Sequence, residues 1–127
     1  MELLTPPSPL VSFFASLRQA PARALLLDYD GTLAPFHVDR RRSFPYPEIQ
    51  TIVQTILQAN HTRVIIVSGR WSEDLLPLLR FDPLPEVWAS HGHERVLSDG
   101  RYRHAPLDAD ATRALAGAYT AIVDAQL

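Results

Sequence analysis

The sequence predicts an α/β domain with a parallel sheet. Three apolar runs, at residues 24–28, 63–67 and 87–89, are continuous rather than alternating, which is typical of strands buried on both faces. Apolar residues at helical spacing over 49–57 separate the first two runs, and a shorter helical pattern at 73–80 separates the second from the third. This alternating order predicts parallel strands joined by right-handed crossovers, and therefore a partial doubly wound sheet.

The first segment, residues 1–22, is expected to hold a leader and one short helix. Ser8 followed by Pro9 is a favourable helix start, because a hydroxyl caps the first turn and proline fits the first helical position. Apolar residues follow at helical spacing up to Gln19, and Pro21 ends the pattern.

Residue types at the helix ends predict where the crossover helices begin and end. Asn60 is a suitable stop for the first, and Ser72 is a candidate N-cap for the second. Pro77 lies beyond the first turn of the second helix, so we expect that helix to be short or kinked. Residues 31–47 contain a glycine, three prolines and no periodicity, which predicts a long irregular loop.

The pattern changes after the third strand. Asp99-Gly100 lies between two short alternating segments within 94–104, which predicts a β-hairpin. Asp108 or Asp110 can cap a last helix. Its apolar positions are Leu115, Ala118, Tyr119, Ile122 and Val123. Nothing that follows would bury this apolar face.

Composition excludes several classes of chemistry. The 127 residues include no cysteine, and all twelve basic residues are arginines, so thiolate and lysine chemistry are excluded. A formal charge of −2 gives no basic footprint for nucleic acid. The N-terminus lacks the basic and unbroken apolar regions of a signal peptide, and no apolar run has membrane-spanning length. We therefore expect a cytoplasmic protein without membrane or nucleic-acid partners.

Polar residues with a glycine follow each predicted strand, at 28–32, 68–70 and 90–94. Ligands of open parallel sheets bind beyond the carboxyl ends of the strands. Asp28 and Asp30 can face one crevice there, and their mutual repulsion favours a cation such as Mg²⁺. One carboxylate can attack phosphorus, and the other can act as general acid and base. For these residues taken alone, a turn beside a strand-end acid is the preferred interpretation, because acids and glycine are common in turns.

The order of these motifs resembles the haloacid dehalogenase (HAD) superfamily of phosphohydrolases. That superfamily has DxDGT after its first strand and a Ser or Thr after the next, and here DYDGTL and VIIVSG follow two buried runs. The segments LLLDYDGTLAPF, VIIVSGR and ASHGHE, within roughly residues 24–107, are further similar to the trehalose-6-phosphate phosphatase family. The resemblance implies a HAD-like Rossmann-type core and Mg²⁺-dependent hydrolysis of a small-molecule sugar phosphate.

The resemblance also implies roles for matching residues. Asp28 would be the nucleophile and a Mg²⁺ ligand, and Asp30 would be the acid/base with its backbone carbonyl on the metal. Thr32 and Ser68 would contact the phosphoryl group. The remaining phosphate- or substrate-side residues would be Gly31, Gly69, Arg70, Ser90, His91, Gly92 and Glu94. For the last segment, a pairing of His91 with Glu94 that only orders the loop is an equal alternative.

Other candidates rank lower. His91, His93 and His104 suggest zinc, but without a fourth ligand they are more typical of surface histidines. The run Arg40-Arg41-Arg42 would raise the local phosphate concentration, but a solvated loop is the favoured interpretation of it. Trp71 and Trp88 are more typical of core or rim aromatics than of sugar platforms.

The resemblance also shows what this sequence lacks. The family uses a lysine and a later pair of acids that completes the metal site, and neither is present here. We therefore expect a partial core at 23–107, followed at 108–127 by the first helix of a truncated cap domain. Such a chain would be an incomplete, inactive or nearly inactive front portion of the enzyme. Its free sheet edge and last helix would favour self-association.

Two alternative functions stay open at this point. The first is another HAD phosphatase for sugar phosphates or phosphoglycerate esters, because the cap that would read the sugar is absent. The second is a non-catalytic phosphatase-like module that binds a partner or a phosphorylated ligand.

Overall fold

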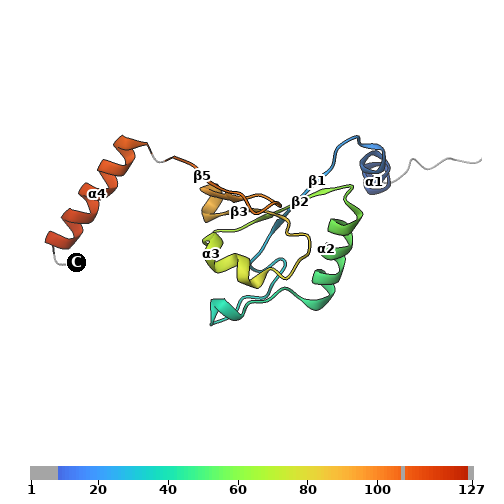
Figure 1. Cartoon of the computed structure of the whole chain (residues 1–127), viewed down its shortest axis with the longest axis horizontal. Coiled ribbons are helices and arrows are strands. Elements are labelled where there is room, and N and C mark those ends of the chain that lie inside the picture. Colours follow the sequence, from blue (N-terminus) through green and yellow to red (C-terminus); the bar gives the residue numbers. More distant parts are fainter. Residues whose placement is uncertain (1–8, 107, 126–127) are drawn as a thin grey trace, which may run out of the picture.

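The computed structural model describes residues 9–106 and 108–125 and is built on one five-stranded sheet (Figure 1). The strands lie in chain order: β1 (Ala24–Asp28), β2 (Arg63–Val67), β3 (Glu86–Ala89), β4 (Glu94–Val96) and β5 (Tyr102–His104). The first three are parallel, and β4 and β5 add antiparallel to β3. The predicted α/β sheet with a terminal hairpin is confirmed.

Within the described residues, four α-helices and three short 3₁₀ turns surround or flank this sheet. The helices are α1 (Pro9–Gln19), α2 (Pro47–Ala59), α3 (Ser72–Leu75) and α4 (Ala109–Asp124). The turns are η1 (Arg40–Arg42), η2 (Leu76–Leu78) and η3 (Ser90–Gly92). In Figure 1 both crossover helices, α2 and α3, lie on the same side of the sheet, while α4 projects away from it.

The core fills the space between the sheet and its two crossover helices. Val64 and Ile66 of β2 face this side and are buried, as are Val53 of α2 and Leu75 of α3. The other side has no such cover in the described part of the chain, and Leu26 of β1 is 55% exposed there. One side of the sheet therefore supplies the packed core that positions the strand ends.

The predicted helix ends are partly right. Asn60 ends α2 with the left-handed backbone (φ 52°) that asparagine tolerates. The helix before Pro77 is short: α3 ends at Leu75 and continues as η2. Ser72 as N-cap is wrong, because α3 begins at Ser72 itself and its amide donates to the Glu94 carboxylate at 2.7 Å. A carboxylate from β4 therefore replaces the hydroxyl cap.

The predictions for the cap of α4 and for the β4–β5 turn agree with the structure. Asp108 caps α4 by accepting from the amide of Asp110, as predicted for one of these two acids. Ser8, the predicted cap of α1, lies outside the described residues. Gly100 has a φ of 81° in the β4–β5 turn, which is the conformation that the Asp99-Gly100 pair predicts.

Several apolar surfaces lack cover in the described residues. Phe13 and Phe14 of α1 are more than half exposed, as are Leu115 and Tyr119 of α4. The outer edge of β1 has no neighbouring strand there. Self-association through these surfaces stays a prediction. None of the described helices combines the length and apolar character needed to cross a bilayer.

Candidate active site

Three loops meet beyond the carboxyl ends of the parallel strands. Asp28, the last residue of β1, pairs in register with Val67, the last residue of β2. The next amide, that of Ser68, donates to the Trp88 carbonyl of β3 at 2.9 Å. Ser90 donates its amide to the Arg70 carbonyl at 2.7 Å. The predicted segments 28–32 and 68–70 and the first residues of the predicted segment 90–94 are therefore adjacent in space.

The loop after β1 is a tight turn around one carbonyl. The Tyr29 carbonyl accepts from the amides of Thr32, Leu33 and Ala34 at 3.0–3.3 Å. Gly31 has a φ of 83°, a backbone conformation that glycine adopts without steric cost. The Thr32 hydroxyl donates to Asp28 Oδ2 at 3.1 Å, which leaves the exposed carboxylate of Asp28 oriented by its own loop.

Asp30 is held by the arginine of the second loop. Arg70 donates from Nε and Nη2 to the two Asp30 carboxylate oxygens, at 2.8 and 2.6 Å. The Arg70 side chain is 4% exposed and that of Asp30 is 27% exposed. These hydrogen bonds lower the pKa of the Asp30 carboxyl below its ordinary value. Asp30 is therefore an ionised carboxylate whose counter-charge is the Arg70 guanidinium.

Arg70 also connects the loop before α2 to the site. Its Nη1 donates to the Arg40 carbonyl at 2.6 Å, and its guanidinium carbon lies 5.5 Å from the centre of the Tyr29 ring. Tyr29 is fully buried, and its hydroxyl donates to the Ser43 carbonyl at 2.6 Å. Burial raises the pKa of this hydroxyl to about 12, so it stays a donor at neutral pH. Arg70 and Tyr29 therefore bind the loop at Arg40 and Ser43 to the site.

The third loop is bent sharply against the second. Ser90, His91 and Gly92 have successive φ values of 50°, 55° and 89°, an uncommon run that stores backbone strain. The His91 ring lies on Gly69, where an added Cβ would be 2.6 Å from His91 Cε1. Ser68 is buried, and its hydroxyl accepts from the Arg70 amide at 3.1 Å.

Glu94 has hydrogen-bond partners outside the three loops. Its carboxylate accepts from the Ser72 amide and from the Tyr102 hydroxyl, each at 2.7 Å. Burial raises its pKa, but these hydrogen bonds outweigh the burial and leave the pKa lowered. The structure thus gives Glu94 partners on α3 and β5, which tie the hairpin to the start of α3. A role toward the sugar stays a prediction.

A family model of trehalose-phosphatases matches residues 26–115. This range includes all three loops of the site. The chain belongs to the trehalose-phosphatase family. A curated relative, the trehalose-phosphatase of Saccharomyces cerevisiae, is 34% identical over 82 residues. That match covers 65% of this chain and 9% of the yeast protein.

Solved structures show the same fold. Trehalose-6-phosphate phosphatase of Aspergillus fumigatus superposes with a TM-score of 0.73 at 21% identity, over 94% of this chain and 45% of that one. The C-terminal domain of the Candida albicans enzyme gives 0.68 at 19% identity, over 94% and 42%. A HAD-superfamily phosphatase of Bacteroides thetaiotaomicron gives 0.56 at 28%, over 72% and 32%. The chain thus spans less than half of each of these relatives.

The oxygen atoms of the site determine whether it could bind Mg²⁺. Mg²⁺ is commonly bound by one or two protein oxygen ligands and several waters. Asp28 offers such a carboxylate, whereas both carboxylate oxygens of Asp30 are bonded to Arg70. No three acidic or histidine side chains gather as a metal cluster among residues 9–106 and 108–125. The donors fit Mg²⁺ in kind, with Asp28 as the available side chain.

Two residues of this site were missed by the sequence reasoning. Tyr29 occupies the variable position of the DxD motif, and only the structure shows its buried hydroxyl holding Ser43. Phe36 lies six positions after Asp30, is next to Gly31 in space, and is 81% exposed. The sequence shows an aromatic residue close to the paired acids, and the structure adds that its ring is exposed.

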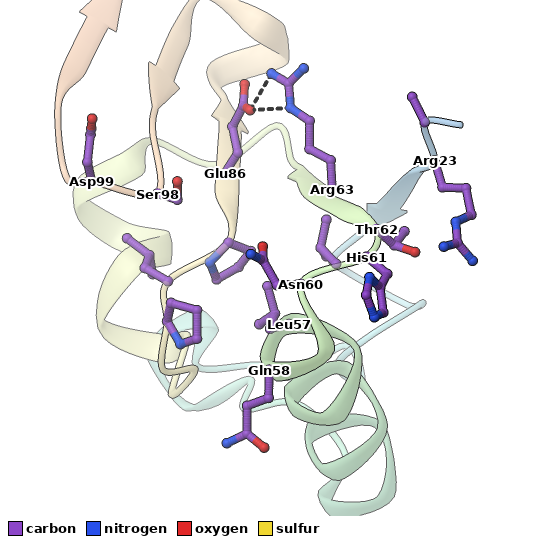
Figure 2. A pocket seen from close by; sticks show the side chains of 15 residues that line it. Arg23, Leu57, Gln58, Asn60, His61, Thr62, Arg63, Glu86, Ser98 and Asp99 are labelled. Carbon is purple, nitrogen blue, oxygen red and sulfur yellow. Dashed lines mark hydrogen bonds and ion pairs between the residues drawn. The ribbon is translucent and has the colours of Figure 1, made fainter. Parts of the chain in front are cut away.

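A separate cavity of about 980 Å³ lies at the opposite edge of the sheet (Figure 2). It is lined by the ends that precede β1, β2 and β3, including Arg23, His61 and Pro85. Its acidic residues, Glu86 and Asp99, pair with arginines, as the Arg63–Glu86 contact in Figure 2 shows. This cavity therefore offers no free carboxylate and is not the candidate active site.

Proposed function

We propose that this chain carries the phosphate-handling half of a sugar-phosphate phosphatase that acts on trehalose 6-phosphate. The observation that supports it is the junction of Asp28, Asp30 and Arg70, in which motifs 40 residues apart form one site. Family membership supports the substrate class, because the relatives' names specify trehalose-6-phosphate phosphatases.

Asp28 is the proposed nucleophile. One of its carboxylate oxygens attacks phosphorus, the bond from phosphorus to the sugar oxygen breaks, and the departing oxygen takes a proton. Water then attacks the aspartyl-phosphate, releasing phosphate and restoring the Asp28 carboxylate. The Thr32 hydroxyl, bonded to Oδ2, holds the carboxylate in place for this attack.

Asp30 is the proposed acid and base for these proton transfers. Its ionised form suits the second step, in which it accepts a proton from water. In the first step it must carry a proton, and both oxygens are bonded to Arg70. At least one of these bonds has to open before Asp30 can donate a proton to the leaving oxygen.

Mg²⁺ is the proposed cofactor, held by the Asp28 carboxylate and the Asp30 carbonyl, and it would neutralise charge on the phosphoryl oxygens. The 127 residues contain no lysine, so an ammonium cannot stabilise the aspartyl-phosphate from within this chain. Loss of one such preorganised charge typically costs about 10²–10³ in rate. We therefore expect slow turnover by this polypeptide.

The test measures phosphate release from trehalose 6-phosphate with Mg²⁺, for the unmodified chain, Asp28→Asn and the control Asp39→Asn. Asp39 is an exposed acid that caps η1. Slow release that Asp28→Asn abolishes and Asp39→Asn retains supports the proposal. Release that survives Asp28→Asn would refute the nucleophile.

A second candidate function is a non-catalytic module that binds phosphorylated ligands. The bidentate Arg70–Asp30 pair favours it, because it leaves the proposed acid without a free oxygen. Binding of trehalose 6-phosphate without release, by a chain that retains its fold, would decide for this module.

A further inference from the structure

Phe36 is an exposed aromatic on a loop that is fixed at its base. The Ser43 hydroxyl donates to the Pro35 carbonyl, and the Tyr29 hydroxyl donates to the Ser43 carbonyl. Arg70 holds the Arg40 carbonyl further along the same loop. The ring itself is 81% exposed. A fixed loop therefore presents an uncovered aromatic ring to solvent.

The Phe36 ring lies directly against the turn that carries the acids. A Cβ built on Gly31 would be 2.6 Å from Phe36 Cε2 and 2.9 Å from Cζ. Gly31 separates Asp30 from Thr32, whose hydroxyl is bonded to Asp28. Single exposed apolar residues on a surface need no explanation, but this ring touches the turn at Gly31, between Asp30 and Thr32.

We propose that Phe36 is a specificity-determining residue whose ring packs against the sugar of the phosphate ester. The inference rests on the proposed function, because it concerns the alcohol part of the same substrate. An ester whose phosphoryl group lies at Thr32 places its alcohol part within reach of a ring that touches the preceding residue. The C–H faces of a sugar carry partial positive charge and pack on the negative face of an aromatic ring.

Val38 provides a matched control on the same loop. It is fully exposed, so its removal tests whether any apolar side chain at this rim contributes. Phe36→Leu removes the ring and keeps apolar volume, while Phe36→Tyr keeps the ring. Together these variants separate an aromatic contact from loop packing.

The experiment measures dissociation constants by amide NMR titration with two probes, trehalose 6-phosphate and methyl phosphate, which lacks a sugar. We expect Phe36→Ala and Phe36→Leu to weaken trehalose 6-phosphate binding roughly two- to tenfold, the range of an aromatic contact. Methyl phosphate binding should stay within about twofold, and Phe36→Tyr and Val38→Ala should match the unmodified chain.

The outcomes separate this inference from the proposed function. Unchanged dissociation constants for both probes in Phe36→Leu overturn the sugar contact and leave the phosphate site standing. Equal losses for both probes assign Phe36 to packing of the turn and also overturn the contact. Failure of the unmodified chain to bind either probe overturns the proposed function together with this inference.

Discussion

Arg70 and Asp30 form a bidentate ion pair between the loops that follow β2 and β1. The guanidinium is almost fully buried, and its Nη1 donates to the Arg40 carbonyl. Sequence reasoning places Arg70 toward the substrate, whereas the structure places its charge on the proposed acid/base. Arg70 is therefore part of the candidate site and also contributes to the stability of the fold.

We expect Arg70→Gln to lower the free energy of unfolding by about 3 kcal/mol, because it leaves the Asp30 carboxylate partly buried without its partner. Urea unfolding followed by circular dichroism measures this change. The double variant with Asp30→Asn should recover part of the loss, because neither side chain then carries an unpaired charge.

Arg101→Gln is the matched control for that substitution. The Arg101–Asp99 pair has side chains that are 66% and 52% exposed, and exposed pairs contribute little to stability because solvent screens their charges. An equal decrease in the free energy of unfolding of Arg70→Gln and Arg101→Gln would contradict the stabilising role of the Arg70–Asp30 pair.

Two glycines of the site should respond differently to alanine. At Gly31, the φ of 83° and the Phe36 ring both oppose a Cβ, so Gly31→Ala should cost about 1–3 kcal/mol. At Gly69 the three nearest atoms all belong to the His91 ring, and a side chain can move. Gly69→Ala should therefore shift the His91 ring resonances in NMR spectra while changing the unfolding free energy by less than Gly31→Ala.

Gly117 in α4 is the control for the glycine pair. A Cβ there would meet nothing within 4 Å, and alanine is favoured over glycine inside a helix by about 0.5–1 kcal/mol. Gly117→Ala should increase the far-UV helical signal. A larger loss for Gly69→Ala than for Gly31→Ala would show that the His91 ring cannot move.

The strands were predictable because each is a short apolar run, and their ends mark the site. Asp28 falls at the end of β1 in both the prediction and the structure, and Ser68 follows β2 as predicted. The helix end at Asn60 and the turn at Asp99-Gly100 were also predictable, because these residue types favour particular conformations of their own backbone. These features depend on neighbours in the sequence.

The errors concern partners that are distant in the sequence. Ser72 has the right residue type for an N-cap, but Glu94, 22 positions away, supplies the acceptor. Likewise, sequence spacing could not show that Arg70 would reach Asp30, 40 positions earlier. Hydrophobic periodicity determines which elements form, whereas the pairing of long polar side chains depends on how those elements pack.

Glu86 provides a pH test that is independent of the candidate site. Its side chain is 7% exposed and accepts from Trp88, Arg63 and Arg95. Burial alone would raise its pKa, but these hydrogen bonds outweigh the burial and lower the pKa from its ordinary value of 4.5. The unfolded chain therefore binds a proton at a higher pH than the folded chain does.

It follows that the stabilisation from the Glu86 carboxylate is complete above the unfolded pKa and is lost as the pH falls through the folded pKa. Urea unfolding between about pH 3 and pH 7 should show less loss of stability toward acid in Glu86→Gln than in the unmodified chain. Glu48→Gln, an exposed glutamate of α2, serves as the control and should keep the unmodified slope. Parallel slopes for Glu86→Gln and the unmodified chain would mean that the arginines and Trp88 do not hold Glu86 ionised.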